Sequence, residues 1–257
     1  MNWNGPVRRW PDRENRLRGL TEPGDVLRKA AGIAAALCWI LFGITAVIRF
    51  TAGDGGYLAD RMLAAAPPPS TGLPEAEYPG VGRMIADYLT GREQVFQYTF
   101  ADAEGNLFRC FHDYEAAHMA DCRELIRLDG IVMAACLAGA AVLTAAGLMI
   151  RPGRPAFFRG MITGLRVAAV FAAVLGIWAL VGFTGLFTAF HRLAFRNDGW
   201  LLDPRTDLLI RLMPEHFFTD LGLRGAVWCL LAPAAVEAAA RIGLRMESHR
   251  TGRTERE

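Results

Sequence analysis

The 257-residue sequence has none of the short motifs that identify the common soluble enzymes. It contains no GxxxxGK(S/T) phosphate-binding loop, no GxSxG nucleophile turn, no CxxC pair and no internal repeat. Its formal net charge is only +2 and is spread over separate segments, which does not indicate a nucleic-acid-binding protein. The missing motifs give no support to nucleotide-dependent chemistry or to a serine or cysteine nucleophile.

Cysteine is scarce as well, and the five thiols have no spacing typical of a disulfide framework. Cys38, Cys136 and Cys229 fall within long apolar segments, where a small thiol is ordinary. Cys110 and Cys122 lie twelve residues apart in a loop that the topology below assigns to the oxidising side of a membrane. The sequence leaves both a bridge between these two and a pair of free thiols open.

Apolar residues, in contrast, are abundant: 53% of the chain is hydrophobic, which is high for a soluble protein. Residues 30–48, 130–150 and 167–190 form uncharged runs of 19, 21 and 24 residues. Each run is long enough to cross ~30 Å of hydrocarbon as a helix that rises ~1.5 Å per residue. The sequence therefore predicts a membrane protein with at least these three spans.

A fourth span is predicted over residues 221–242, although its uncharged part, residues 225–236, has only 12 residues. Arg224 and Glu237 must then turn toward the membrane surface or face protein. Neighbouring helices can accommodate the kink expected at Pro233. The first run has the basic start of a signal peptide, but its 19 uncharged residues exceed a typical signal core, which favours a retained anchor.

The distribution of arginine predicts how these spans are oriented. Residues 1–29 have seven Lys/Arg against four acids, residues 151–166 have four Arg and no acid, and residues 241–257 have five Arg against three acids. The other two loops, 51–128 and 191–224, have six Arg against twelve acids and five Arg against five acids. With four spans the three basic segments lie on one face, so both termini are predicted to be cytoplasmic.

The predicted fold is mainly α: a bundle of four transmembrane helices with a small extracytoplasmic α/β cap. In chain order we expect a basic cytoplasmic N-terminus, the first span, the cap with an interfacial helix, the second span, a cytoplasmic loop, the third span, an extracytoplasmic loop, the fourth span and a cytoplasmic tail. These segments are residues 1–29, 30–50, 51–128, 129–150, 151–166, 167–190, 191–220, 221–242 and 243–257.

Local patterns in the predicted cap indicate one helix and one hairpin. Helical spacing relates Val81, Met84, Ile85, Tyr88 and Leu89. Phe96, Tyr98 and Phe100 alternate as in a strand, and the turn-forming residues 102–106 precede a second short apolar stretch, which predicts a hairpin. Residues 64–80 are rich in Pro and Gly and are predicted to be irregular.

A helix is predicted from Asp113 into the second span, because no helix breaker precedes Gly130. Glu115 and His118 share one stripe of this helix, and Asp121 lies three residues beyond the histidine. A straight, vertical helix would lift His118 ~18 Å above Gly130. We therefore expect this segment to tilt along the membrane surface, with a bend near Gly130.

Histidine supplies the candidate acid–base groups. His118 lies between Glu115 and Asp121, and either carboxylate could hold its ring and favour its protonated form. His191 directly follows the third uncharged run, at the depth of the lipid ester carbonyls. Each histidine alone also fits an interfacial or capping role, and Asp203 fits a turn that caps a helix over residues 207–213.

Two segments around these histidines match a known pattern. EAAHMADC, residues 115–122, is similar to ExxHMxDV, and FHRLAFRNDGWLLDPRTDLLIRLMPEHFF, residues 190–218, is similar to FHxxFFxNxxWxLDPxxDxLIxxxPxxFF. In this order, before the second span and after the third, they resemble the lipoprotein intramolecular transacylase (Lit) family of bacterial integral membrane proteins. The sequence departs at Cys122, where the family usually has Val, and at Leu193–Ala194, where an aromatic residue is common.

The resemblance implies an enzyme of the bacterial cytoplasmic membrane with its active site at the outer face. Such enzymes move the sn-2 acyl chain of a lipoprotein's diacylglyceryl group to the α-amine of the same N-terminal cysteine, giving a lyso-form lipoprotein. The implied partners are diacylated bacterial lipoproteins and membrane lipid, without nucleic acid. No metal or other cofactor is implied.

The resemblance also places His118 and His191 at the active site. Because the attacking amine must lose a proton and the oxyanion needs donors, we expect His118 to act as the base and His191 as the donor, although these roles are interchangeable. The orienting or oxyanion-binding candidates are Glu115, Asp121, Arg123, Asn197 and Asp203.

Two other functions stay open at the level of the sequence. A zinc-dependent membrane hydrolase would need His112, His118, His191 and Asp121 to converge, although positions 112 and 118 lie about 120° apart on a helix. A non-enzymatic carrier or assembly partner is the second alternative. Transport usually needs polar groups at mid-bilayer, and the three clear spans carry no charge.

Overall fold

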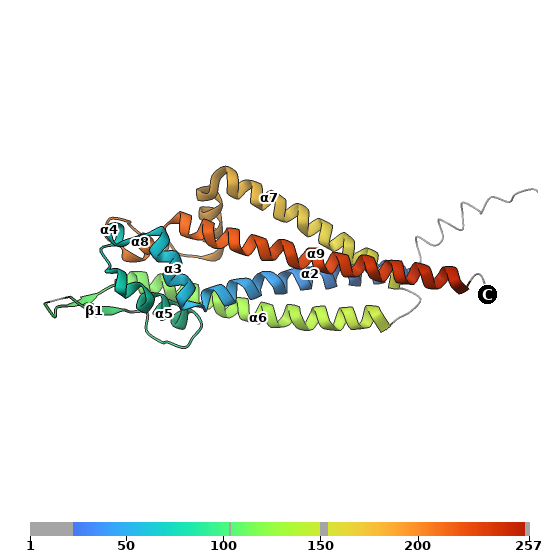
Figure 1. The fold of residues 1–257 in the computed structure, drawn as a ribbon, viewed down its shortest axis with the longest axis horizontal. Coiled ribbons are helices and arrows are strands. Elements are labelled where there is room, and N and C mark those ends of the chain that lie inside the picture. Colours follow the sequence, from blue (N-terminus) through green and yellow to red (C-terminus); the bar gives the residue numbers. More distant parts are fainter. Residues whose placement is uncertain (1–22, 103, 150–153, 255–257) are drawn as a thin grey trace, which may run out of the picture.

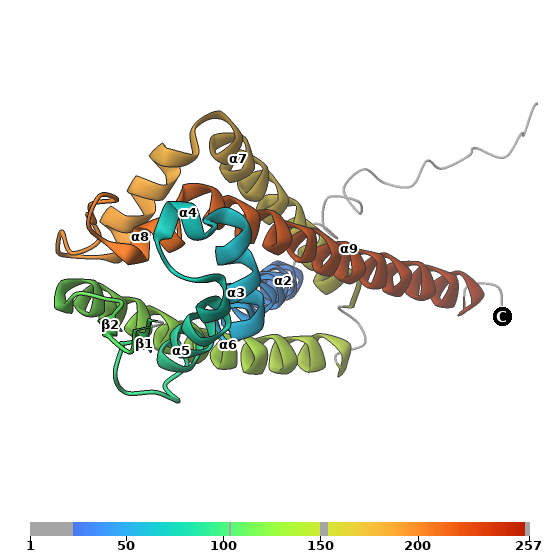
Figure 2. The ribbon, with the colours of Figure 1, turned by 60° about the vertical axis from the view of Figure 1, so that its left-hand side comes forward.

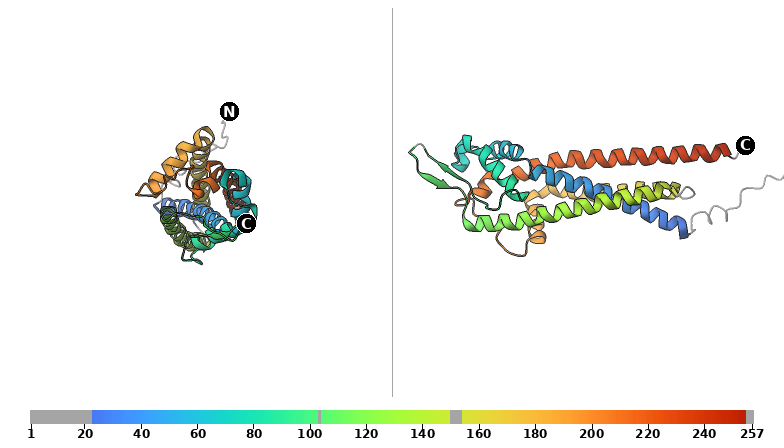
Figure 3. Two further views of the ribbon diagram at one scale, coloured as in Figure 1. Left: turned by 90° about the vertical axis from the view of Figure 1, so that its left-hand side faces the viewer. Right: turned by 90° about the horizontal axis from the view of Figure 1, so that it is seen from below.

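Four long helices make up most of the computed structural model, which describes residues 23–102, 104–149 and 154–254. They are α2 (Pro23–Ala52), α6 (Asp113–Met149), α7 (Arg154–Ala194) and α9 (Glu215–Thr254). The helices form an elongated bundle (Figures 1 and 3). The chain is therefore mainly α, as predicted. Parts of the predicted cytoplasmic segments, residues 1–22, 151–153 and 255–257, lie outside the described residues.

Three of these helices, α2, α6 and α7, are long and apolar enough to cross a membrane, among the residues that the structure describes. Helix α9 has 40 residues and stays helical through Pro233, so it is long enough as well. Its longest uncharged stretch is short, because only 12 residues separate Arg224 from Glu237. A fourth membrane span in α9 therefore remains a prediction.

Helix α2 is the central element of the bundle, in contact with α6, α7 and α9. Its approach to α7 is close: a Cβ atom on Gly32 would lie 2.1 Å from the Phe157 carbonyl oxygen, and one on Gly160 would lie 2.1 Å from that of Lys29. Small residues at such crossings let helix backbones approach without a larger side chain between them. The α2–α7 contact therefore depends on glycine in both helices.

Replacing Gly32 by alanine is expected to lower the free energy of unfolding by about 1–3 kcal/mol, because the added Cβ must push two backbones apart. Gly43→Ala is the matched control in the same helix, since its Cβ would meet nothing within 4 Å. Thermal unfolding of both variants in detergent measures the difference. Equal melting temperatures for the two variants would contradict the packing described here.

One end of the bundle carries a second hydrophobic core, which we call the head. It includes α3 (Gly55–Ala65), α5 (Tyr78–Leu89), α8 (Leu208–Leu212), the start of α6 and a two-stranded hairpin (Figures 1 and 2). The hairpin pairs β1 (Thr99–Ala101) with β2 (Leu107–Arg109) in antiparallel fashion, so the predicted helix and hairpin are both present. An extracytoplasmic location of the head remains a prediction.

The segment predicted to be irregular, residues 64–80, is more ordered than its composition indicates. It contains α4 (Pro68–Thr71) and the 3₁₀ turn η1 (Glu75–Glu77) between α3 and α5. The buried Tyr78 hydroxyl donates to the Ala66 carbonyl oxygen and lies 2.8 Å from the Thr71 hydroxyl oxygen. These bonds close the Pro-rich segment onto Tyr78, which is part of the head core.

The bend predicted near Gly130 is absent from the described part of α6, which continues as one helix from Asp113 to Met149. The break lies in α7 instead, where Gly182 has φ −165° and ψ 77°. Beyond that glycine, residues 183–194 turn sharply back across the bundle (Figures 1 and 2). The chain therefore brings the end of α7 to α6, rather than the start of α6 to α7.

Candidate active site

The two predicted histidines lie next to each other. His118 is the sixth residue of α6, and His191 lies in the last turn of α7. Their ring centroids are 6.3 Å apart and the ring planes are inclined by 30°. Each is 8% exposed, and the Phe195 ring packs against both. Both histidines lie outside the uncharged runs 130–150 and 167–190. Their convergence makes this the candidate active site.

The tautomer of neutral His191 follows from its hydrogen bond. Its Nδ1 atom lies 2.8 Å from the carbonyl oxygen of Phe187, and because a carbonyl can only accept, Nδ1 carries the proton. Burial lowers the pKa of His191, and the bond to the carbonyl opposes this in part. In the neutral ring the lone pair is then on Nε2, where it can accept a proton.

The pKa of His118 is lowered as well. Burial lowers its pKa, the nearby His191 lowers it further, and the charge of Asp121 opposes both effects. The expected preference for a protonated His118 is therefore reversed. Its Nε2 atom lies 3.6 Å from Cys122 Sγ, while its Nδ1 atom is buried without a hydrogen-bond partner among the described residues.

The candidate orienting carboxylates are engaged elsewhere. Glu115 is fully buried and accepts the backbone N–H of His112 at 2.7 Å and that of Leu209 at 2.8 Å. The prediction that it holds the His118 ring is therefore wrong, because both of its oxygens join the start of α6 to α8. Asp121 accepts the side-chain amide of Asn197 at 2.9 Å. This pair links α6 to the loop after α7.

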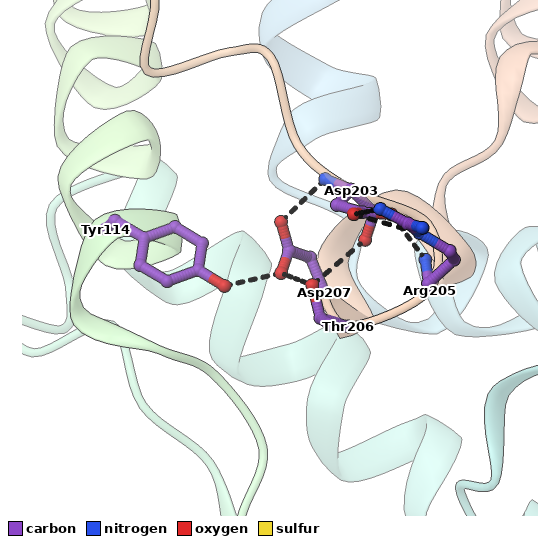
Figure 4. Close-up of polar contacts among 5 residues, drawn as sticks. All are labelled: Tyr114, Asp203, Arg205, Thr206 and Asp207. Atoms are coloured by element: carbon purple, nitrogen blue, oxygen red, sulfur yellow. Dashed lines mark hydrogen bonds and ion pairs between the residues drawn. The ribbon is translucent and has the colours of Figure 1, made fainter.

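A second buried carboxylate, Asp207, reinforces this junction (Figure 4). It accepts the hydroxyl of Tyr114, the hydroxyl of Thr206 at 2.7 Å and the backbone N–H of Asp203 at 2.8 Å. The sequence placed Asp207 only at the start of a predicted helix, and nothing in the spacing indicated that Tyr114, 93 residues away, would bind it. Asp207 does occupy the N-cap position of α8, but its side chain makes no capping bond.

Two further candidates lie away from the histidine rings. Asp203 pairs with Arg205 at 2.6 Å, and this hydrogen-bonded guanidinium lowers the pKa of Asp203 to about 2 (Figure 4). Asp203 therefore shapes the turn before α8. Arg123 donates to the side chain of Gln94 at 3.1 Å and lies over the Tyr88 ring, so it supports the head.

The zinc site considered from the sequence does not assemble. Among the residues that the structure describes, no group of three or more His, Cys, Asp or Glu side chains could hold a metal ion. His112 instead stacks on the ring of Tyr114, with centroids 5.2 Å apart. Cys110 and Cys122 are both free thiols, so of the two options left open for this pair the structure has the unbridged one.

Comparison with known proteins gives a consistent set of matches. A model of one family, described as lipoprotein intramolecular transacylase Lit, matches residues 33–218. The in meso structure of the membrane integral lipoprotein intramolecular transacylase Lit from Bacillus cereus is similar in fold, with a TM-score of 0.67 and 18% identity over 87% of this chain and 98% of that chain. A variant of that protein with a histidine-to-arginine substitution gives a TM-score of 0.62 and 18% identity over 92% and 98%. No curated protein matches the sequence.

Proposed function

The chain belongs to the lipoprotein intramolecular transacylase family, whose model matches 33–218, and from this premise we propose the reaction and the roles of its histidines. The substrate is a diacylated bacterial lipoprotein. The enzyme moves the sn-2 acyl chain from the glycerol oxygen to the α-amine of the same N-terminal cysteine. The observation that carries this proposal is the pair of buried histidine rings, with centroids 6.3 Å apart, at the junction of α6 and α7.

The proposed reaction needs no nucleophilic side chain. Amine and ester already belong to one molecule, so holding them together can supply effective molarities up to about 10⁵–10⁸ M. The amine nitrogen attacks the ester carbonyl, its N–C bond forms and a tetrahedral oxyanion develops. The C–O bond to glycerol then breaks, the nitrogen loses a proton and the glycerol oxygen gains one. One proton acceptor and one donor complete the transfer, and the proton taken up by the acceptor then passes to the donor, so that both side chains return to their starting state.

We assign the acceptor to His191 and the donor to His118, the reverse of the roles expected from the sequence. The reason is the bond from His191 Nδ1–H to the Phe187 carbonyl, which leaves the Nε2 lone pair available. An α-amine has a pKa of ~8 and is mostly protonated at pH 7. A neutral imidazole is therefore needed to take up the proton that the nitrogen loses. Burial, which lowers the pKa of His191, keeps this ring neutral. His118, with an unpartnered Nδ1, faces the oxyanion and the leaving oxygen.

This proposal includes a location at the outer face of the bacterial cytoplasmic membrane. Four spans, with the fourth in α9, and cytoplasmic termini follow from the arginine distribution. In a background without native cysteines, an engineered cysteine at Ser70 or Thr206 should then react with an impermeant maleimide in intact cells, and one at Gly153 should not. Protection at Ser70 or Thr206 with labelling at Gly153 would reverse the topology.

Mass spectrometry of a synthetic diacylglyceryl-cysteine lipopeptide tests the reaction. Intramolecular transfer makes an isomer, so the mass stays the same while the free α-amine is lost to acetylating reagents and the fragment spectrum gains an N-acyl cysteine. A hydrolase would instead lower the mass by releasing a fatty acid. Hydrolysis, or no change with a folded protein, would overturn the proposed function.

A further inference from the structure

Cys122 contacts the active site directly. Its Sγ atom lies 3.6 Å from His118 Nε2, one turn further along α6, and its side chain packs at the edge of the head core. At this position the family pattern usually has Val, which offers no hydrogen. The thiol is therefore a feature of this chain that the proposed reaction does not use.

Both partners of this contact are neutral near pH 7. Burial raises the pKa of the Cys122 thiol to about 12, so the sulfur keeps its hydrogen. Burial also lowers the pKa of His118, so that ring has one protonated nitrogen and one lone pair. A neutral thiol is a weak donor through S–H and a weak acceptor through sulfur, whereas the unprotonated nitrogen of an imidazole is a good acceptor. The lone pair of His118 is thus the better partner for the thiol.

We propose that Cys122 is a positioning residue: its S–H donates to His118 Nε2 and thereby fixes the ring proton of His118 on Nδ1. The inference deepens the proposed function and rests on it for its catalytic meaning. Nδ1 is buried and has no protein partner among the described residues, as expected for a donor whose acceptor arrives with the substrate. That acceptor is the ester carbonyl oxygen, which becomes the oxyanion.

The two histidines then present opposite hydrogen-bonding groups to the substrate, an acceptor on His191 and a donor on His118. The Phe187 carbonyl holds the His191 proton on Nδ1, which leaves an acceptor at Nε2, while the Cys122 thiol occupies the His118 acceptor and leaves a donor at Nδ1. The reverse arrangement, with His118 Nε2–H donating to sulfur, would leave a lone pair at Nδ1, which cannot donate to the oxyanion. The thiol therefore selects the useful tautomer before substrate binds.

The tautomer can be read directly by ¹⁵N NMR of histidine-labelled protein at about pH 8, where both rings are neutral. His118→Gln assigns the signals. In the wild type we expect a protonated Nδ1 and an unprotonated Nε2 on His118. In Cys122→Val and Cys122→Ala this preference should weaken toward a mixture, whereas Cys110→Val, which changes a second thiol at the same core, should leave the His118 signals unchanged.

Kinetics give the second measurement. Loss of one neutral hydrogen bond should lower kcat of Cys122→Val about fivefold with KM unchanged. Three results would overturn the inference while transacylation continued. They are a wild-type His118 protonated on Nε2, His118 signals in both Cys122 variants that are unchanged from wild type, or the same change of signals in Cys110→Val. A thiol-dependent tautomer in a protein that does not convert the lipopeptide would support the Cys122 contact and overturn the proposed function instead.

Discussion

Replacing either histidine by alanine should slow acyl transfer at least ~10²-fold while the protein stays folded, since that is the low end for losing a general acid or base. His191→Ala removes the Nε2 lone pair that we assign to the amine proton, and His118→Ala removes the Nδ1 donor. The double variant should be little worse than the poorer single variant, because residues that act as a unit are strongly non-additive. The rate is that of N-acyl cysteine formation in the lipopeptide assay.

The matched controls are the two histidines outside the pair. His216 is exposed and lies 2.7 Å from the Ala65 carbonyl oxygen, and His112 stacks on Tyr114. Alanine at either position should leave turnover close to wild type. Full activity in folded His191→Ala would reduce that residue to an interfacial anchor and contradict the proposed mechanism. Multiplicative losses in the double variant would mean that the histidines act independently.

Much of the fold follows from the sequence because its signals are local. Uncharged runs predict α2, α6 and α7, the helical spacing around Ile85 predicts α5, and alternation next to a turn predicts the hairpin. The break in α7 was not predictable in this way. Gly182 lies within an apolar run among other glycines, and its extended backbone is set by where residues 183–194 pack.

The candidate site was likewise predictable only in part from the sequence. His118 and His191 were identifiable from motif resemblance, and the structure brings their rings together. Their partners were not identifiable, because Glu115 meets Leu209 across 94 residues and Asn197 meets Asp121 across 76. Spacing on one helix indicates which residues share a face, but tertiary packing decides which atoms satisfy a buried carboxylate.

Glu115→Ala should destabilise the head. It removes the acceptor of two backbone N–H groups, those of His112 and Leu209, from a fully buried position. The Leu209 N–H is buried, and an unsatisfied buried N–H costs about 1–3 kcal/mol, so the free energy of unfolding should fall by about that amount. Thermal unfolding in detergent measures this loss. Acyl transfer should fall with it, because α6 and α8 separate and His118 is no longer held toward His191.

Glu115→Gln and Glu124→Gln distinguish this structural role from catalysis. Glutamine at 115 retains one acceptor oxygen and turns an NH₂ group toward the other N–H, so the protein should melt at a temperature between those of wild type and Glu115→Ala. Glu124 lies on the same helix, exposed and paired with Arg127 at 2.7 Å, and its amide variant should melt like wild type because exposed ion pairs contribute little. A Glu115→Gln protein with the wild-type melting temperature but without activity would move Glu115 from the helix junction into the chemistry.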